Sequence, residues 1–232
     1  MANEVKADIA RKSAEILQKI KADSRLSHYI PNIPTDRIPT VFMETDDVRD
    51  IRLIVIGQDP TVKNEVSRKT IETVLNLDKP RGSLYKYISQ ICEGLGLDLR
   101  RHVYATNYAK NFFIHPPTQI KECNILEECS QYWLPLLQEE LYLFPFRPII
   151  TLGEPLLKAL SIDPKKASVR RYWGYTPDWV GAETIFSFVS QEENKLDRRF
   201  YPFPHQPSLR KRFYSTKLQS YLGYMKNTMI QG

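Results

Sequence analysis

The chain has 232 residues, of which 42% are hydrophobic and 26% charged, with a formal net charge of +6 and a pI near 9.1. These values suit one soluble globular domain with a good core and exclude a low-complexity chain. No run of eighteen apolar residues is present, and the charged, amphipathic start lacks a secretory apolar block. We therefore expect an intracellular protein of the cytoplasm or nucleoid, with no membrane contact.

The first predicted element is an amphipathic helix over residues 4 to 21, because Ile9, Ser13, Leu17 and Ile20 fall near one helical face. The stretch from 29 to 42 has three prolines, each preceded by isoleucine, and should run extended over the surface. Residues 1 to 45 are thus predicted to be a helix and a connector, and residues 1 to 232 a single domain.

Short β-branched or apolar runs follow the connector. They span residues 51 to 56, 102 to 107, 147 to 152 and 183 to 189. Helical patterns beginning at Ser83 and at Glu122 separate the first three runs, and a closing helix is predicted from Leu209 to Met229. This alternation predicts an α/β fold, with a central four-stranded, mainly parallel sheet flanked by helices.

The ends of the predicted strands carry polar side chains. The first strand ends in Gly57-Gln58-Asp59-Pro60, the second ends at Asn107, and the fourth leads through a polar loop to His205. Ligands bind at the carboxyl ends of the strands in open parallel sheets. A carboxylate, an amide and an imidazole are therefore expected to face one crevice.

Each of these three side chains has a chemical and a structural interpretation. Asp59 could activate a water or stabilise a cation, with Gly57 letting the backbone approach a ligand, or it could shape its own turn. Asn107 could read the hydrogen-bonding edge of a base, or cap a loop. His205, held between prolines, could donate to a developing anion, or be structural.

Two later segments combine basic and aromatic residues. Residues 201 to 217 carry four basic residues and no acidic one, a mix that suits phosphates and bases, although a solvated basic helix start is an equal alternative. The segment from 164 to 179 fits either a DNA-facing hairpin or a packed hairpin with a basic rim.

The three cysteines, Cys92, Cys123 and Cys129, form no CxxC pair, so we expect reduced thiols and no metal.

Four motifs, in order, resemble the uracil-DNA glycosylase superfamily. GQDP (57 to 60) resembles the water-activating loop of its best-known branch, and VYATNYAKN (103 to 111) resembles the uracil-recognition strand of the thermophilic, iron-sulfur branch. LGEPLLKAL (152 to 160) resembles the strand and helix start that follow, and HQPSLRK (205 to 211) resembles the DNA-intercalation loop. The resemblance runs from about Ile51 to Tyr214.

This resemblance implies a DNA glycosylase that hydrolyses the N-glycosidic bond of uracil or a related modified base, flipped out of DNA, in base excision repair. Asp59 would position the hydrolytic water and support the sugar cation, and Asn107 would pair with the uracil edge. His205 would stabilise the negative charge on uracil O2, and Gln58 would contribute its backbone amide. The expected enzyme is a monomer that needs no cofactor.

The resemblance also implies a DNA-contacting set. Leu209 would be the wedge that enters the base stack when the target nucleotide rotates out of single- or double-stranded DNA. Ser83 and Ser208 would grip the flanking phosphates. Arg210 and Lys211, from the basic segment, would add positive charge beside them.

The chain departs from the family at several positions. Thr61 stands where the best-known branch has a tyrosine that excludes the thymine methyl group, and Gln206 replaces a proline. Residues 61 to 84 contain no aromatic side chain to stack on the base, so Val74, Leu75 or another segment takes that place. The chain also lacks the cysteines of the iron-sulfur branch, which predicts no cluster.

These departures leave the preferred base open among uracil, thymine and 5-modified uracils. They also keep a second class of function in view, a catalytically silent glycosylase-like module that binds DNA or a partner. A hydrolase of free nucleosides is a third and weaker alternative.

Overall fold

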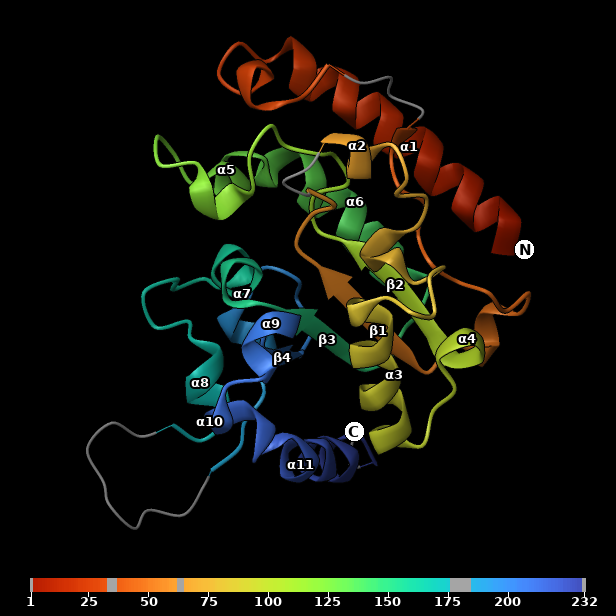
Figure 1. Ribbon diagram of the computed structural model, residues 1–232, viewed down its shortest axis with the longest axis vertical. Helices are drawn as coiled ribbons and strands as arrows, with labels where there is room; N and C mark the ends of the chain where they lie inside the picture. Colours follow the sequence, from red (N-terminus) through yellow and green to blue (C-terminus); the bar gives the residue numbers. More distant parts are fainter. Residues whose placement is uncertain (1, 33–36, 62–64, 176–184, 231–232) are drawn as a thin grey trace.

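A four-stranded parallel sheet forms the centre of the computed structural model, which describes residues 2–32, 37–61, 65–175 and 185–230 (Figure 1). Its strands, in the spatial order β2-β1-β3-β4, are β1 Leu53–Gly57, β2 Val103–Asn107, β3 Ile149–Leu152 and β4 Tyr201–Phe203. All three strand pairs are parallel. The predicted α/β class and four-stranded sheet are confirmed.

The strands are buried along their whole length, as a parallel sheet covered on both faces requires. The ladder between β1 and β2 runs from Leu53 beside Val103 to Gly57 beside Asn107. This register sets the last residue of β1 directly beside the last residue of β2, at the carboxyl edge of the sheet.

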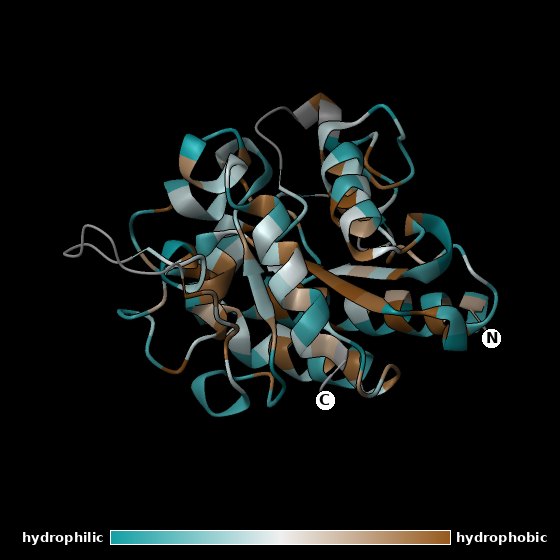
Figure 2. Cartoon of the chain, turned by 90° about the horizontal axis from the view of Figure 1, so that it is seen from below, coloured by the Kyte–Doolittle hydropathy of each residue, from teal (hydrophilic) through white to brown (hydrophobic). Residues whose placement is uncertain are grey.

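Helices cover the sheet and connect its strands. They are α1 Ala2–Ala22, α2 Glu65–Arg68, α3 Ser83–Leu95, α4 Leu99–His102, α5 Ile125–Glu128, α6 Ser130–Tyr142, α7 Glu154–Leu160, α8 Val169–Tyr172, α9 Gln206–Leu209, α10 Arg212–Ser215 and α11 Leu218–Ile230. Helix α1 packs against α6, and α3 packs against α11 (Figure 1). Hydrophobic residues concentrate on the strand that crosses the centre in Figure 2, whereas the outer helices alternate hydrophobic and hydrophilic residues.

The predicted N-terminal helix is confirmed. Helix α1 buries Ile9, Ser13, Leu17 and Ile20 along one face. In the connector, residues 33–36 lie outside the described residues, but Phe42 forms an antiparallel bridge with Ala105, with N to O distances of 2.9 Å in both directions. The connector therefore adds one bridge to the outer edge of β2.

The prediction of a strand over residues 183 to 189 is wrong for its described part. Residues 185–189 make only isolated bridges, and the fourth strand is β4, Tyr201–Phe203. β4 lies at the edge of the sheet, so Pro202 needs no amide hydrogen for a neighbour on its outer side. β4 lies within residues 201 to 217, the segment whose sequence was interpreted as a basic and aromatic surface.

The segment from 164 to 179 is packed in its described part. It forms α8, after which Trp173 bridges Phe186 in antiparallel fashion; residues 176–179 lie outside the described residues. The indole of Trp173 is buried, donates to the carbonyl of Pro202 at 2.7 Å and stacks on Tyr221 at 4.4 Å. These contacts favour the packed alternative, with Arg170 and its neighbour exposed on the rim.

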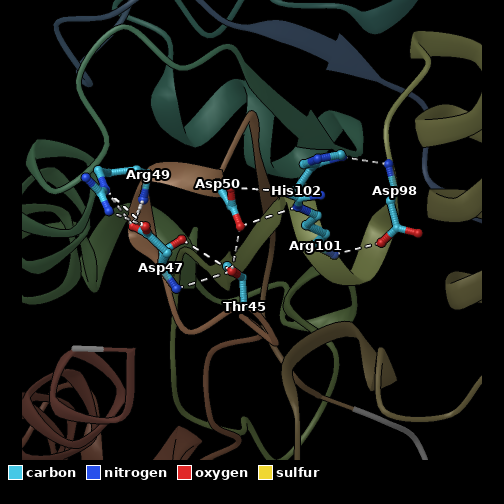
Figure 3. A network of polar contacts seen from close by, with 7 residues as sticks. All are labelled: Thr45, Asp47, Arg49, Asp50, Asp98, Arg101 and His102. Atoms are coloured by element: carbon cyan, nitrogen blue, oxygen red, sulfur yellow. Dashed lines mark hydrogen bonds and ion pairs between the residues drawn. The ribbon is translucent and has the colours of Figure 1, made fainter.

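A polar network joins the segments that enter β1 and β2 (Figure 3). Arg101 Nε donates to Asp50 Oδ2 at 3.3 Å, and the Asp98 amide donates to His102 Nδ1 at 2.8 Å. The hydroxyl of Thr45 donates to the same Asp50 oxygen at 3.3 Å. The network lies at the amino edge of the sheet, opposite the edge where Gly57 and Asn107 meet.

Among the helices of the described ranges, none is both long and apolar enough to cross a membrane.

Candidate functional site

Gly57 leaves space for two side chains at the carboxyl edge of the sheet. A Cβ atom built at this position would lie 2.3 Å from Asn107 Oδ1 and 2.6 Å from Leu75 Cδ2. Sequence reasoning assigned this glycine to the close approach of a ligand. In the structure, the space that it frees holds the side chains of Asn107 and Leu75.

The side-chain amide of Asn107 is buried without a partner. The residue is 1% exposed, and neither Oδ1 nor Nδ2 has a hydrogen-bond partner among the described residues. Leaving a buried donor or acceptor unpaired costs about 1 to 3 kcal/mol per group, so such atoms in a folded protein need an explanation. A ligand that carries its own donor and acceptor would supply both missing bonds.

Lys110 supports Asn107 from inside the protein. Its buried ammonium contacts Glu140 Oε1 at 2.5 Å and donates to Thr106 Oγ1 at 2.5 Å and to the Asn107 carbonyl at 2.7 Å. Tyr104 donates to the other oxygen of Glu140 at 2.5 Å. Burial lowers the pKa of Lys110, and the charge of Glu140 opposes that shift. Sequence reasoning missed this pair because lysine and glutamate are rarely fully buried.

Leu75 lies between residues 61 and 84, where the family pattern has an aromatic side chain and this chain has none. Its backbone has a φ of 58°, and Asn76 follows with a φ of 52°. Non-glycine residues rarely adopt this left-handed conformation, which costs about 1 to 3 kcal/mol each where the fold enforces it. Val74 is buried in the core, whereas Leu75 is half-buried and extends over Gly57 beside the Asn107 amide.

Asp59 lies just beyond the end of β1 and is half-buried. Gln58 Nε2 donates to its Oδ1 at 2.6 Å, and the Thr61 amide donates to its Oδ2 at 2.9 Å. Burial raises the pKa of Asp59 to about 6, because desolvation disfavours the charged form more than these hydrogen bonds favour it. The carboxylate is thus mainly ionised at neutral pH but stands close to its titration range.

Thr61 has a structural role. Its hydroxyl accepts a hydrogen bond from the Phe113 amide at 2.8 Å, which joins the loop after β1 to the chain after β2. Its own amide fixes the Asp59 carboxylate. Thr61 is therefore held by backbone contacts at the position where the family pattern has its tyrosine.

His205 follows β4 and stands at the start of α9. The hydroxyl of Tyr87, on α3, donates to the carbonyl of Pro204 at 2.9 Å and thereby fixes the residue that precedes the histidine. His205 is exposed, but the protein around it displaces part of its water, and this desolvation lowers the pKa of its imidazole and favours the neutral form. A cavity of about 340 Å³ borders this imidazole and is also lined by Ser208 and Lys211.

The remaining predicted residues differ in their exposure. Ser83 is the first residue of α3 and is exposed, as are Arg210 and Lys211. Leu209 is half-buried and packs against the hydrophobic core. Arg170 lines the same cavity as His205, and its guanidinium lies 4.8 Å from the ring centre of Phe213, a pair that sequence reasoning did not connect.

The site residues form two groups along one edge. Asp59 and Asn107 follow the adjacent strands β1 and β2, whereas His205 follows β4, with β3 between the groups. The loop order along the sheet therefore gathers carboxylate, amide and imidazole at the same edge. Cys92 and Cys129 are buried apart from it, and burial raises the pKa of each thiol to about 12.

Within the described part of the chain, no group of three or more His, Cys, Asp or Glu side chains converges as a metal site would require. No protein-family model matches the chain, and a search of curated proteins finds no match.

Proposed function

We propose that this protein is a DNA glycosylase, which hydrolyses the N-glycosidic bond of uracil or a related modified base flipped out of DNA. The observation that carries this proposal is the Asn107 amide, buried at the carboxyl edge of a parallel sheet with both its donor and its acceptor unpaired. The ordered motif quartet supplies the class of reaction. The geometry around Asp59 and His205 supports it.

The Asn107 amide complements the edge of uracil. Uracil presents one N–H donor beside a carbonyl acceptor, and an asparagine side chain presents an oxygen acceptor beside an NH₂ donor. Pairing the two would satisfy both orphan atoms of Asn107 at once. Leu75, which extends beside that amide, would pack on the face of the base.

The two ionisable groups suit the charge separation of the reaction. As the bond from the sugar C1′ to the base nitrogen breaks, its electron pair leaves with the base, and the sugar becomes cationic. The Asp59 carboxylate stabilises that cation and orients a water, whose oxygen bonds to C1′ while the carboxylate accepts the proton that the water loses. A neutral His205 donates a hydrogen bond to the anionic base, so both contacts are stronger in the transition state than in the ground state.

The surface beside His205 suits DNA. Ser208 and Lys211 line its cavity, and Arg210 is exposed next to them. Hydroxyl and cationic groups of this kind bind phosphates. Because the reacting bond is inaccessible inside a duplex, the target nucleotide must rotate out of the stack, and Leu209 lies on α9 between these phosphate-binding groups.

The test is base release from an oligonucleotide that contains one uracil, followed by alkali and detection of strand scission. We expect scission with the wild-type protein, and a rate about 10²- to 10³-fold lower with Asp59→Asn, which should still bind DNA. Absence of scission on single- and double-stranded substrates, for uracil, 5-modified uracils and other deaminated bases, would refute the proposal.

One observation favours the second candidate, a catalytically silent module that binds DNA. Both oxygens of Asp59 already accept hydrogen bonds, from Gln58 and from Thr61. Salt-dependent DNA binding without release of any base from the panel would identify this function.

A further inference from the structure

A second cavity, of about 1000 Å³, lies at the amino edge of the sheet, opposite the candidate site. Its lining includes residues that lead into each strand: Arg52 before β1, His102 before β2, Pro148 before β3 and Arg199 before β4. Because all four strands are parallel, this edge is separate from the edge that carries Asp59. The cavity is therefore not part of the proposed active site.

The cavity carries an excess of positive charge. Its lining contains the guanidinium groups of Arg52, Arg147, Arg198 and Arg199 and a single carboxylate, Asp197. Asp197 Oδ1 accepts a hydrogen bond from Gln191 at 2.7 Å and forms no ion pair with the described arginines.

The four arginines of this cavity differ in their hydrogen-bond partners. Arg198 donates to the carbonyls of Leu141 and Arg147 at 2.8 and 2.6 Å, and Arg199 donates to the Thr228 carbonyl at 3.3 Å. The side chains of Arg52 and Arg147 make neither a hydrogen bond nor an ion pair with any described residue. Two fixed cations thus stand beside two that are available to a ligand.

The nearby acidic residues are already paired. Asp47 binds Arg49 through both carboxylate oxygens, and Asp50 accepts from Arg101 (Figure 3). These two carboxylates, the acidic residues that directly precede Arg52 in the sequence, therefore have partners other than Arg52.

Exposed aromatic side chains line the same cavity. Tyr142 is 88% exposed and Phe146 is 92% exposed. Phe146 also has a φ of 61°, a conformation that bulky residues rarely adopt. Large apolar side chains that are exposed together mark interaction surfaces more often than scattered ones do.

We propose that this cavity binds an acidic peptide segment of a partner protein, with carboxylates on Arg52 and Arg147 and an apolar side chain against Tyr142 and Phe146. The lining contains four arginines and exposed aromatic residues but no lysine. Protein interfaces are enriched in arginine and aromatic residues and depleted of lysine, which favours a protein partner over a nucleic acid. The inference does not depend on the proposed glycosylase activity.

The test titrates the full chain into a fluorescein-labelled peptide of alternating glutamate and leucine with one central phenylalanine, and measures fluorescence anisotropy. The matched probe replaces every glutamate with glutamine. We expect the acidic peptide to bind, the glutamine peptide to bind at least about tenfold more weakly, and added salt to weaken only the first.

Variants locate the binding surface. Arg52→Glu, Arg147→Glu and Phe146→Ser should each weaken the acidic peptide about tenfold or more. The matched control is Arg11→Glu, on α1 and outside the cavity lining, which should leave the affinity unchanged. Thermal melting of each variant within a few degrees of wild type shows that the fold is retained. This is expected because Arg52 and Arg147 make no side-chain bond to a described residue, and because the ion pairs of Arg11 are exposed and contribute little to stability.

Three results would overturn the proposal: equal binding of the two peptides, peptide binding that the cavity variants do not change, or cavity variants that weaken a single-stranded oligonucleotide while sparing the peptide. The last would assign the cavity to nucleic acid.

Discussion

At the scale of single residues, Asp59 combines burial with two hydrogen bonds, and the balance places its pKa at about 6. If its ionised form is needed for base release, kcat/KM should fall about tenfold per pH unit below about pH 6 and level off above it. Measuring uracil release from about pH 4.5 to 8 checks this. The residual activity of Asp59→Asn should lack that acidic limb, and an identical limb in the variant would assign it to another group.

The same pKa predicts an effect on stability. A carboxyl group whose pKa is raised on folding binds more protons in the native state, so its contribution to stability is present at low pH. That contribution is lost as the pH rises from about 4 to about 6. Asp59→Asn should therefore raise the free energy of unfolding at pH 7 by about 1 to 2 kcal/mol. Urea denaturation of both proteins at pH 4 and pH 7 measures this difference in the free energy of unfolding, which should be smaller at pH 4.

Gly57 offers a steric test of the Asn107 amide. In Gly57→Ala the new methyl group would collide with Asn107 Oδ1 and Leu75 Cδ2, so we expect a loss of about 1 to 3 kcal/mol of stability and most of the base release. The matched control is Gly223→Ala on α11, where a Cβ meets nothing within 4 Å and should stabilise the helix by about 0.5 to 1 kcal/mol. Thermal melts and release assays compare the two, and equal behaviour would contradict the packing argument.

At the scale of elements, the buried pair of Lys110 and Glu140 connects the segment after β2 to α6. Lys110→Met leaves a charged Glu140 without its partner and should cost about 3 to 5 kcal/mol, whereas Lys110→Met with Glu140→Gln should cost clearly less. The glutamine still accepts from Tyr104, so the double variant isolates the ion pair. Chemical denaturation of the wild type, the two single variants Lys110→Met and Glu140→Gln, and the double variant gives the coupling energy, and additive costs would mean that the two charges do not interact.

The strands show which parts of the fold follow from local sequence. β1, β2 and β3 are buried on both faces and were predicted from short β-branched or apolar runs, a pattern typical of such strands. β4 was missed because it has only three residues and contains Pro202. Apart from Ser187, residues 185–189 are β-branched or aromatic, yet they meet Trp173 and Phe200 only through single bridges.

In the candidate site, too, some features follow from local sequence and others depend on packing. Strand ends were sufficient to place Asp59 and Asn107 at one edge of the sheet. His205 lies at the same edge, but the strand that precedes it is β4 and not the predicted one. The unpaired state of Asn107 and the support from Lys110 depend on contacts between side chains. No local pattern contains those contacts, because burial is a property of the whole packed molecule.

At the scale of the whole molecule, the two basic residues between α9 and α10, Arg210 and Lys211, should govern DNA affinity. Arg210→Ala and Lys211→Ala should each weaken binding and lower the slope of log K against log salt by about 1 if the side chain neutralises one phosphate. Arg11→Ala on α1, which pairs with Asp8 and Glu15, is the control and should leave the slope unchanged. Anisotropy titrations at several salt concentrations measure the slopes, and unchanged slopes in all three variants would place the DNA elsewhere.

The bridge between Phe42 and Ala105 limits pairing of the edge strand β2 with a strand of another molecule. Strands with free amide and carbonyl groups on their outer side can pair with the same strand of another molecule and start aggregation. The connector occupies part of that side of β2, while Pro202 and the bridge from Val189 to Phe200 obstruct β4. A proline-rich segment that carries none of the candidate site residues thus protects one edge of a hydrophobic sheet from pairing with another copy at high protein concentration.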